Sequence, residues 1–396
     1  MTLLLAKKSN KTRELNTVIV NSVDKINSDH WNLVLNDRNI YLSLAYLQAI
    51  EKSLKRDIAF RYLLFYNAAS KPVAIAVVQC LLFIDKGRKE HEQFCSVRNT
   101  IKDKIVDPLG AKVLVCGNPF SCGENGFLFV NDISAVQAYI NLAKELLLLQ
   151  KREEKELGAS LVLAKEFWPS SVSVANEFEG VGFKGFFADV NMVLALSDSW
   201  KSFDDYLLSM NTKFRTKAKA AYKKSTDVVV KEFEAKDIIQ YSATINYLYG
   251  QVLDKSLFKF GELNADVFCH LKKALKKDFI FTGYFVEENL VGFSTAFISN
   301  ATLDANYVGI NYNLNQKYAL YSRMLYDYVA LAITRRCSQL SFGRTAEEIK
   351  SSVGALPVNM KLYIRHKNIL TNKLVKSIVG AIKPSKFELR APFKVA

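Results

Sequence analysis

Hydrophobic and polar residues alternate in two stretches of the chain, and each stretch predicts a pair of β-strands joined by a tight turn. RYLLFYNAASKPVAIAVVQCLLF (61–83) places its turn at 68–72, and FIFTGYFVEENLVGFSTAFI (279–298) places its turn at 287–289. A segment with helical periodicity precedes each hairpin, at 44–54 and at 266–276. The two halves of the chain therefore open with the same order of elements.

The same correspondence continues after the hairpins. A long predicted helix leads to a strand in each half, first in SAVQAYINLAKELLLLQKREEKEL (134–157) with SLVLAKEF (160–167), then in YSRMLYDYVALAITRR (321–336) with SQLSFGRT (338–345). A second helix follows in each half, and the tripeptide VNM then opens a strand at 190 and again at 358. We interpret this series as a duplicated unit of ~170–200 residues. The expected fold is mixed α/β, with two similar domains at 1–197 and 198–396, each a central sheet flanked by helices.

The segment between the two units predicts a strongly basic helix at 198–225. Its apolar stripe consists of Leu207, Phe214, Ala218 and Ala221. Lysine and arginine surround that stripe. Arg215, Lys219 and Tyr222 share part of the surface and are candidates for binding a phosphate-rich donor or an anionic lipid, and a solvated basic face is the alternative.

Composition narrows the class of protein. The 396 residues carry a net charge of +15, because 54 Lys and Arg outnumber 39 Asp and Glu, so phosphates, anionic lipids or acidic carrier proteins are suitable partners. The six cysteines form no Cys-x-x-Cys pair and the four histidines are isolated, which argues against disulfides and a metal site. No signal peptide or membrane-spanning stretch is predicted. We expect a cytoplasmic protein, soluble or peripheral at the inner face of the membrane.

Several of these segments together resemble the FemAB-like branch of the GNAT (Gcn5-related N-acyltransferase) superfamily. The resemblance rests on WKSFDDYLLSMNTKFRTKAKAAYKK, GINYNLNQKYALYSRMLYDYV and FGRTAEEIKSSVGALP, and upstream on SLAYLQAI, KPVAIAVVQCLLF and VLVCGNPFSCGENGF. It implies two GNAT folds in tandem and transfer of an activated acyl or aminoacyl group to an amine. It also implies no tightly bound cofactor and no covalent intermediate, with an acyl thioester or an aminoacyl-tRNA as co-substrate.

One motif departs from the pattern of most coenzyme A users. Those proteins carry R/Q-x-x-G-x-G/A before the long helix, where glycines let backbone N–H groups approach a pyrophosphate. The matching stretch here is QKYALY (316–321), with Ala319 and Tyr321 at the glycine positions. An ordinary acetyl-CoA site is therefore not favoured, whereas an acyl carrier protein or an aminoacyl-tRNA remains open as donor.

Candidate catalytic residues lie where the central strands of a GNAT fold separate. Asp304, in TLDANYVGI (302–310), is a candidate base or ammonium anchor, and Tyr307 a candidate cleft residue. Because they are three apart in a strand, they are expected on opposite faces. Near the start of the following helix, Tyr321 is a candidate proton donor to the leaving group. Surface or packing roles are the alternative for all three.

Contacts to the substrate are expected from two further segments. Lys317 and Tyr318 are candidates for donor binding. In FGRTAEEIKSSVGALP (342–357), Thr345 and Glu348 fit a capping box. Arg344 precedes this cap, and Lys350 follows at i,i+3 from Glu347, so both are candidates for substrate binding or for a structural ion-pair set. The aligned position in the first half is Glu166, which favours a working pocket in the C-terminal half only.

The tail KNILTNKLVKSIVGAIKPSKFELR (367–390) is basic and partly amphipathic. It permits peripheral membrane contact, and docking of its apolar residues, Ile369, Leu370, Leu374 and Ile378, into a core is the alternative. The leading function is an acyl- or aminoacyltransferase acting on an amine, in lipid or cell-wall precursor metabolism. The competing function is a catalytically silent GNAT-like module that binds an anionic envelope precursor or nucleic acid. Sequence-specific DNA binding is disfavoured, since no helix-turn-helix or zinc-finger pattern occurs.

Overall fold

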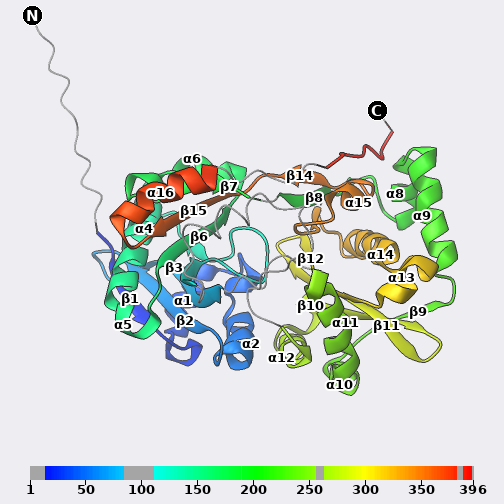
Figure 1. Ribbon diagram of the computed structural model, residues 1–396, viewed down its shortest axis with the longest axis horizontal. Coiled ribbons are helices and arrows are strands. Elements are labelled where there is room, and N and C mark those ends of the chain that lie inside the picture. The colour runs from blue at the N-terminus through cyan, green and yellow to red at the C-terminus, as the bar shows by residue number, and fades with distance from the viewer. Residues whose placement is uncertain (1–13, 84–110, 189, 256–262, 381–386, 395–396) are drawn as a thin grey trace, which may run out of the picture.

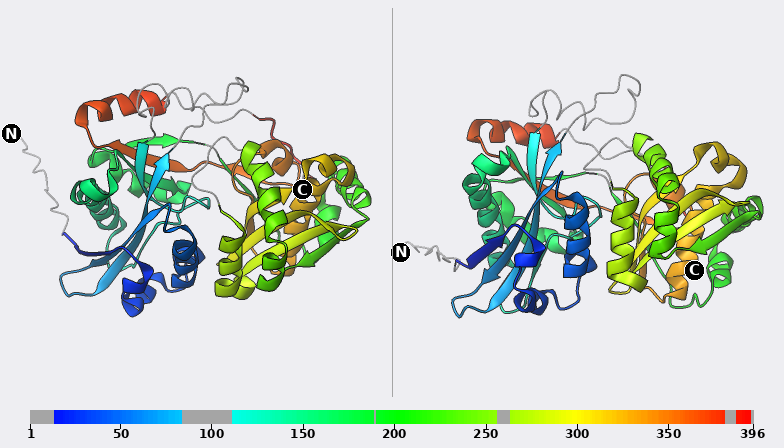
Figure 2. Two further views of the ribbon diagram at one scale, coloured as in Figure 1. Left: turned by 60° about the horizontal axis from the view of Figure 1, so that its bottom comes forward. Right: turned by 90° about the horizontal axis from the view of Figure 1, so that it is seen from below.

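Two mixed sheets lie side by side with helices around them (Figures 1 and 2). The computed structural model describes residues 14–83, 111–188, 190–255, 263–380 and 387–394. The first sheet has the order β1 (Asn16–Val20), β2 (Ala59–Tyr66), β3 (Pro72–Phe83), β4 (Ala111–Cys116), β6 (Leu161–Phe167), β15 (Lys361–His366), β7 (Lys184–Phe187), and β5 (Phe127–Phe129) pairs with β3. The second has the order β9 (Val228–Glu232), β10 (Phe279–Val286), β11 (Asn289–Ser299), β12 (Thr302–Ile310), β13 (Gln339–Ser341), β8 (Asn191–Ala195), β14 (Leu356–Val358).

The two sheets have matching topology, as the duplicated sequence pattern predicts. In each sheet one central pair is parallel, β4 with β6 and β12 with β13, and every other pair is antiparallel. The predicted hairpins form β2–β3 and β10–β11. The expected mixed α/β fold with two flanked sheets is confirmed.

The sheets exchange one strand each. β8, from the end of the first half, pairs with β13 and β14 in the second sheet, whereas β15, from the end of the second half, pairs with β6 and β7 in the first. Figure 1 shows β15 and α16 beside the N-terminal half and β8 beside the C-terminal half. A division of the chain between residues 197 and 198 therefore follows the sequence repeat but not the sheets. β8, which begins within the first VNM tripeptide, and β15, which directly follows the second, each lie in the sheet of the other half.

Helices cover both faces of each sheet. In the first half they are α1 (Ser28–Leu35), α2 (Leu44–Leu54), α4 (Ala135–Arg152), α5 (Glu154–Leu157), α6 (Pro169–Ala175) and α7 (Glu177–Gly180). In the second they are α8 (Phe203–Ser209), α9 (Thr212–Lys224), α10 (Ala235–Gln240), α11 (Ser242–Lys255), α12 (Ala265–Leu275), α13 (Tyr312–Tyr318), α14 (Leu320–Thr334) and α15 (Glu347–Ser351), and α16 (Ile369–Gly380) packs on β15 and β7.

The predicted basic helix at 198–225 is wrong as one element. It is divided into α8 and α9 at Met210 and Asn211, where the backbone is extended and pairs with the C-terminal segment. Asn211 N–H donates to the carbonyl of Pro392 at 2.8 Å, so a tertiary hydrogen bond replaces the helical one. A Ser202–Asp205 capping box begins α8.

One hydrophobic core joins the two halves. It includes buried residues of α2 and β2, such as Tyr46 and Tyr62, and of α12 and β11, such as Phe268 and Phe297. Separate cores lie on the outer faces, one against α4 and one against α14. The inner face of each sheet therefore looks toward the other half, and side chains there can combine residues from both.

The structure also bears on membrane and metal chemistry. Within the described residues, no helix is long and apolar enough to cross a bilayer, and no group of three His, Cys, Asp or Glu is placed to hold a metal ion. The five cysteines in the described part are free, and Cys95 lies outside it.

Candidate active site

The central parallel strands of the second sheet separate next to a buried carboxyl. β12 and β13 pair at three positions, and Asp304 opposite Ser341 is the last of them. Asp304 is 8% exposed, and its Oδ2 accepts a hydrogen bond from the hydroxyl of Tyr41 in the N-terminal half. Asn306 Nδ2 donates to that same hydroxyl at 2.7 Å. The second carboxylate oxygen, Oδ1, has no hydrogen-bond partner among the described residues.

Burial changes the acidity of this carboxyl. It raises the pKa of Asp304 to about 6, and the hydroxyls of Tyr41 and Ser341, which favour the charged form, oppose this effect only in part. A carboxylate with a pKa close to neutrality and one unpaired oxygen is suited to general base catalysis. It is also suited to anchoring an ammonium group.

A β-bulge places Tyr307 on the same face as Asp304, so the expectation of opposite faces is wrong. Asn306 and Tyr307 together stand opposite Thr295 on β11, which inserts one extra residue in β12. The bulge reverses the side-chain alternation after Asn306. Tyr307 packs on Phe268 in the core between the sheets and donates from its hydroxyl to the carbonyl of Phe120 at 2.5 Å.

The N-terminal half supplies the opposite wall through the loop between β4 and β5 and the end of β6. Lys165 Nζ donates to the carbonyls of Asn118 and Ser121, both at 2.6 Å, and to Glu166 Oε2 at 3.0 Å. A Cβ atom at Gly117, whose φ is +146°, would lie 2.7 Å from Cβ of Lys165. Since β4 and β6 correspond to β12 and β13, the Lys165 side chain fills the place where the N-terminal pair separates.

Arg344 and Glu166, the aligned positions of the two halves, form an ion pair with each other. Arg344 Nη1 lies 2.9 Å from Glu166 Oε1, and the side chains are 29% and 1% exposed respectively. Lys350 Nζ donates to the carbonyls of Arg344 at 2.6 Å and Gly343 at 3.3 Å. Burial lowers the pKa of Lys350 to about 8. Lys350 therefore holds the backbone of the turn that presents Arg344.

The predicted capping box at Thr345 is wrong. Thr345 and Ala346 both have left-handed φ values, 63° and 53°, and α15 begins only at Glu347, with no side-chain cap. The left-handed turn moves the helix start beyond Thr345. Glu348 forms an ion pair with Arg390 in the C-terminal segment.

The remaining candidate residues lie across the sheet from the Asp304 side chain, on α9, α13 and α14. Arg215 is partly exposed and Lys219 is exposed, while Tyr222 donates to Asp327 Oδ1 at 2.9 Å. Lys317 is exposed, with its ammonium 4.7 Å from the ring centroid of Tyr318. Their roles stay predictions, as do those of Tyr307, Arg344 and Lys350.

The start of α14 differs from a pyrophosphate site in its contacts. Ala319 has a left-handed φ of 50°, the conformation that a glycine would favour. The N–H of Tyr321 donates to Asn315 Oδ1 at 2.9 Å. One of the N–H groups that a helix start could offer to a phosphate is therefore already hydrogen-bonded within the protein. The Tyr321 ring packs in the outer core, and burial raises the pKa of its phenol.

Sequence reasoning missed the residues that the N-terminal half contributes. Tyr41, from the 3-10 turn Ile40–Leu42, and Lys165 both contact the site, and Asn118 Nδ2 donates to the Tyr46 hydroxyl at 2.8 Å. Only GNPFSCGENG (117–126) gave a signal, because a Gly- and Asn-rich loop directly after a buried strand is typical of functional loops.

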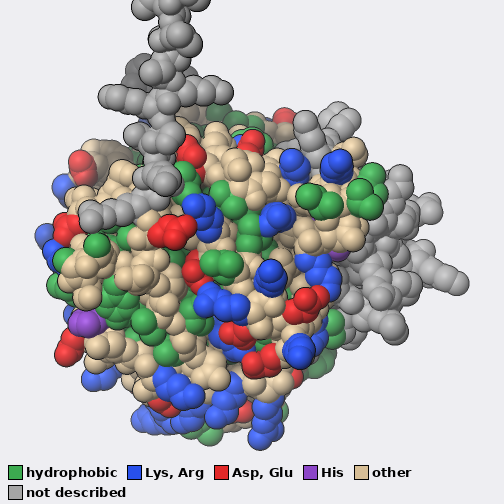
Figure 3. Space-filling view, turned by 90° about the vertical axis from the view of Figure 1, so that its left-hand side faces the viewer, with side chains coloured by type: hydrophobic (Ala, Val, Ile, Leu, Met, Phe, Trp, Pro, Cys, Tyr) green, Lys and Arg blue, Asp and Glu red, His purple; other side chains and the backbone are tan. Residues whose placement is uncertain are grey.

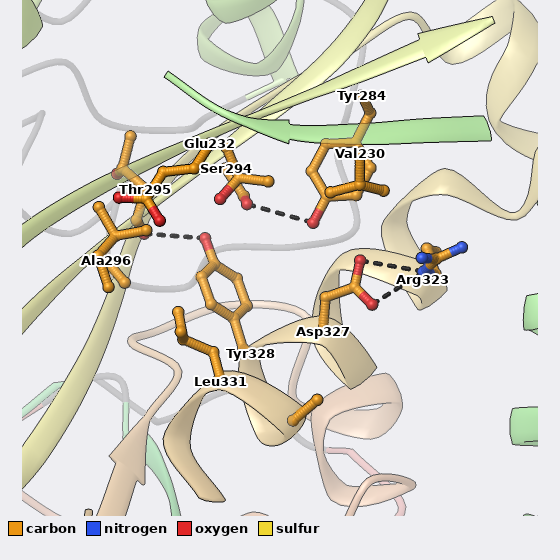
Figure 4. A pocket seen from close by; sticks show the side chains of 13 residues that line it. Val230, Glu232, Tyr284, Ser294, Thr295, Ala296, Arg323, Asp327, Tyr328 and Leu331 are labelled. Atoms are coloured by element: carbon orange, nitrogen blue, oxygen red, sulfur yellow. Dashed lines mark hydrogen bonds and ion pairs between the residues drawn. The ribbon is translucent and has the colours of Figure 1, made fainter. Parts of the chain in front are cut away.

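A separate cavity of about 300 Å³ lies between α14 and β9–β11, on the outer face of the second sheet (Figure 4). Tyr328 donates to the carbonyl of Thr295 at 2.9 Å, and Arg323 Nε contacts both oxygens of Asp327 at 2.8 and 3.0 Å. Arg323 and Asp327 therefore neutralise each other, and Glu232, the third charged residue of the wall, pairs with Lys272 at 3.1 Å. Asp304 is not among the residues that line this cavity, and its side chain points to Tyr41 on the inner face of the sheet.

Solved structures of other proteins share the fold of this chain. No family model and no curated protein sequence matches the chain. A crystal structure of FemX matches 92% of this chain and 100% of its own, with a TM-score of 0.54 and 11% identity. A tandem GNAT protein from the clavulanic acid biosynthesis pathway matches 90% of this chain and 99% of its own, with a TM-score of 0.52 and 10% identity.

The protein has a tandem GNAT fold. The expected resemblance to FemAB-like proteins is confirmed at the level of fold. At these identities the similarity establishes no donor, acceptor or catalytic residue.

Proposed function

We propose that the protein transfers an acyl or aminoacyl group from an activated donor to an amine, at the junction where β12 and β13 separate. The observation that carries the proposal is Asp304. It is buried, its pKa is raised to about 6, and one of its oxygens is unpaired at the point where parallel GNAT strands open. The tandem GNAT fold agrees with a transferase.

The proposed chemistry requires one proton transfer at Asp304. The acceptor enters as an ammonium, and Asp304 Oδ1 takes one of its protons. The free amine nitrogen then forms a bond to the carbonyl carbon of the donor, and the bond from that carbon to the thioester sulfur or the ester oxygen breaks. The acylated nitrogen then loses its second proton, and the leaving sulfur or oxygen takes up one proton. Tyr307, on the Asp304 side of the sheet, is the candidate relay for this transfer, whereas Tyr321 packs in the outer core on the opposite face. Tyr41, bonded to Oδ2, orients the carboxylate.

The proposal leaves two chemical classes of donor. An acyl thioester, carried on coenzyme A or an acyl carrier protein, and an aminoacyl-tRNA are the two forms expected from the resemblance. The occupied N–H at Tyr321 favours a donor without a pyrophosphate at that helix start. The exposed lysines of α9 offer a contact for an acidic carrier protein or for tRNA. Such donors are cytoplasmic, which agrees with the expected location.

The direct test is transfer of labelled acyl or aminoacyl groups from thioesters and charged tRNA to a panel of amines. The purified full chain is compared with Asp304→Asn, which keeps the shape of the side chain. We expect ~10²–10⁴-fold slower transfer by the variant. Transfer by both proteins at the same rate would refute the role of Asp304. No transfer from any donor by well-folded protein would refute the proposed activity.

The closed site favours a second candidate function. Lys165 fills the N-terminal strand opening, and Asp304, hydrogen-bonded to Tyr41, is only 8% exposed. A silent GNAT-like module that binds an anionic envelope precursor would retain these contacts without turnover. Binding of such a precursor with no product would support this alternative.

A further inference from the structure

Helix α16 carries a row of exposed aliphatic side chains at the end of the N-terminal half. Ile369, Leu370 and Leu374 are 71%, 69% and 56% exposed. The opposite side of the helix is anchored, since Val375 is fully buried and Asn372 Nδ2 donates to the carbonyl of Gly182 at 2.9 Å. These three side chains are therefore not docked into a core, which was the alternative for this tail, and the side chain of Ile378 lies outside the described part. We call these three residues the α16 patch.

The position of α16 leaves the α16 patch accessible. The helix lies on the outside of the first sheet, over β15 and β7, and away from the junction with the C-terminal half (Figure 1). Figure 3 looks at this end of the molecule, where hydrophobic side chains are interspersed with both basic and acidic side chains. Large aliphatic side chains grouped on one helix and bordered by polar residues mark an interaction surface.

The positive charge around the α16 patch favours an anionic partner. From Lys361 to Val375 the chain has four Lys and Arg and no Asp or Glu, and Lys361 pairs with Glu179 at 2.8 Å. Lys373 is exposed within the helix, and Lys367, just before it, pairs with Glu154 at 3.0 Å. Exposed aliphatic groups next to excess positive charge match an anionic bilayer surface, into which the aliphatic groups insert while lysines meet the headgroups.

We propose that α16 docks the protein on the surface of an anionic membrane. Leu370 and Leu374 enter the headgroup region, and Lys373 contacts lipid phosphates. Docking at this end leaves the Asp304 junction free. The inference does not depend on the proposed reaction, because it concerns another surface and is measured without turnover.

Sedimentation of the full chain with vesicles tests the proposal. One set of vesicles contains phosphatidylcholine alone, and the other also contains phosphatidylglycerol. We expect binding to the second set only, weakened by salt because the attraction is electrostatic. The triple variant Ile369→Ser, Leu370→Ser, Leu374→Ser should bind at least ~10-fold more weakly, and Lys373→Glu should bind more weakly as well.

The control is a variant with equally exposed aliphatic residues replaced elsewhere. Leu208→Ser with Ile239→Ser changes side chains that are 61% and 56% exposed on the C-terminal half, and it should bind like the natural chain. Circular dichroism checks that each variant is folded. Equal binding to neutral vesicles, full binding by the triple variant, or no binding by the natural chain would each overturn the proposal.

Discussion

The raised pKa of Asp304 lowers the free energy of unfolding above neutral pH. A carboxyl with a pKa of ~3.9 in the unfolded chain and about 6 in the folded protein binds its proton more tightly when folded. Between these values the folded group keeps its proton while the unfolded group has lost it. The free energy of unfolding therefore falls as pH rises through this window, by up to ~3 kcal/mol.

Asp304→Asn should remove this pH-dependent penalty. We expect the variant to be at least as stable as the natural chain at pH 8, as measured by urea unfolding, while it loses transfer activity. The matched control is Asp327→Asn, because Asp327 is half-buried but paired with Arg323. That variant leaves Arg323 without its counter-charge and should lose stability. A large loss of stability in Asp304→Asn at pH 8 would indicate a structural role for this carboxyl.

The Arg344–Glu166 pair predicts strong coupling between two positions that are 178 residues apart in sequence. Arg344→Ala leaves the buried Glu166 with only Lys165 as a counter-charge and should cost ~2–4 kcal/mol. Glu166→Gln should also destabilise, since it leaves two cations near each other. The double variant should lose less stability than the sum of the two, with a coupling of ~1–3 kcal/mol in urea unfolding. Additive losses would mean that the contact contributes nothing.

At the scale of elements, the bulge in β12 connects the two halves through Tyr307. Tyr307→Phe keeps the ring but removes the hydrogen bond to Phe120, which should cost ~1 kcal/mol and loosen the loop between β4 and β5. Amide exchange in that loop should become faster. Tyr206→Phe is the control, because its hydroxyl also donates to a carbonyl, that of Val353 at 2.9 Å, away from the loop. Equal exchange in both variants would contradict the proposed link.

The sequence predicted elements well where local pattern decides them and failed where distant contacts decide them. Both hairpins and helix α2 follow alternation and periodicity, and the structure has them where expected. The break at Met210 depends on a partner at Phe393, nearly the whole C-terminal half away. The β-bulge at Asn306 has no signature in the pattern of hydrophobic and polar residues, so the sequence does not predict it. Of the candidate site, Asp304 was predicted, but Tyr41 and Lys165 reach it only through packing of the other half.

At the scale of the whole molecule, the strand exchange makes the two halves depend on each other. The first sheet contains β15 from the second half, the second contains β8 from the first, and one core includes residues of both. A chain cut at residue 197 would leave the 1–197 fragment without β15 between β6 and β7, and the 198–396 fragment without β8 between β13 and β14. Each fragment would expose strand edges and half of the shared core.

We therefore expect neither fragment to fold alone, although both sequences look like complete units. Each should lack a cooperative urea transition when expressed separately, and a mixture refolded together should recover one transition and elute as a single complex in size-exclusion chromatography. The intact chain should unfold in one step, because loss of either sheet removes a strand from the other. Independent cooperative unfolding of the 198–396 fragment would show that β8 is dispensable. In that case the junction at Asp304 would have to assemble from two units that are stable apart.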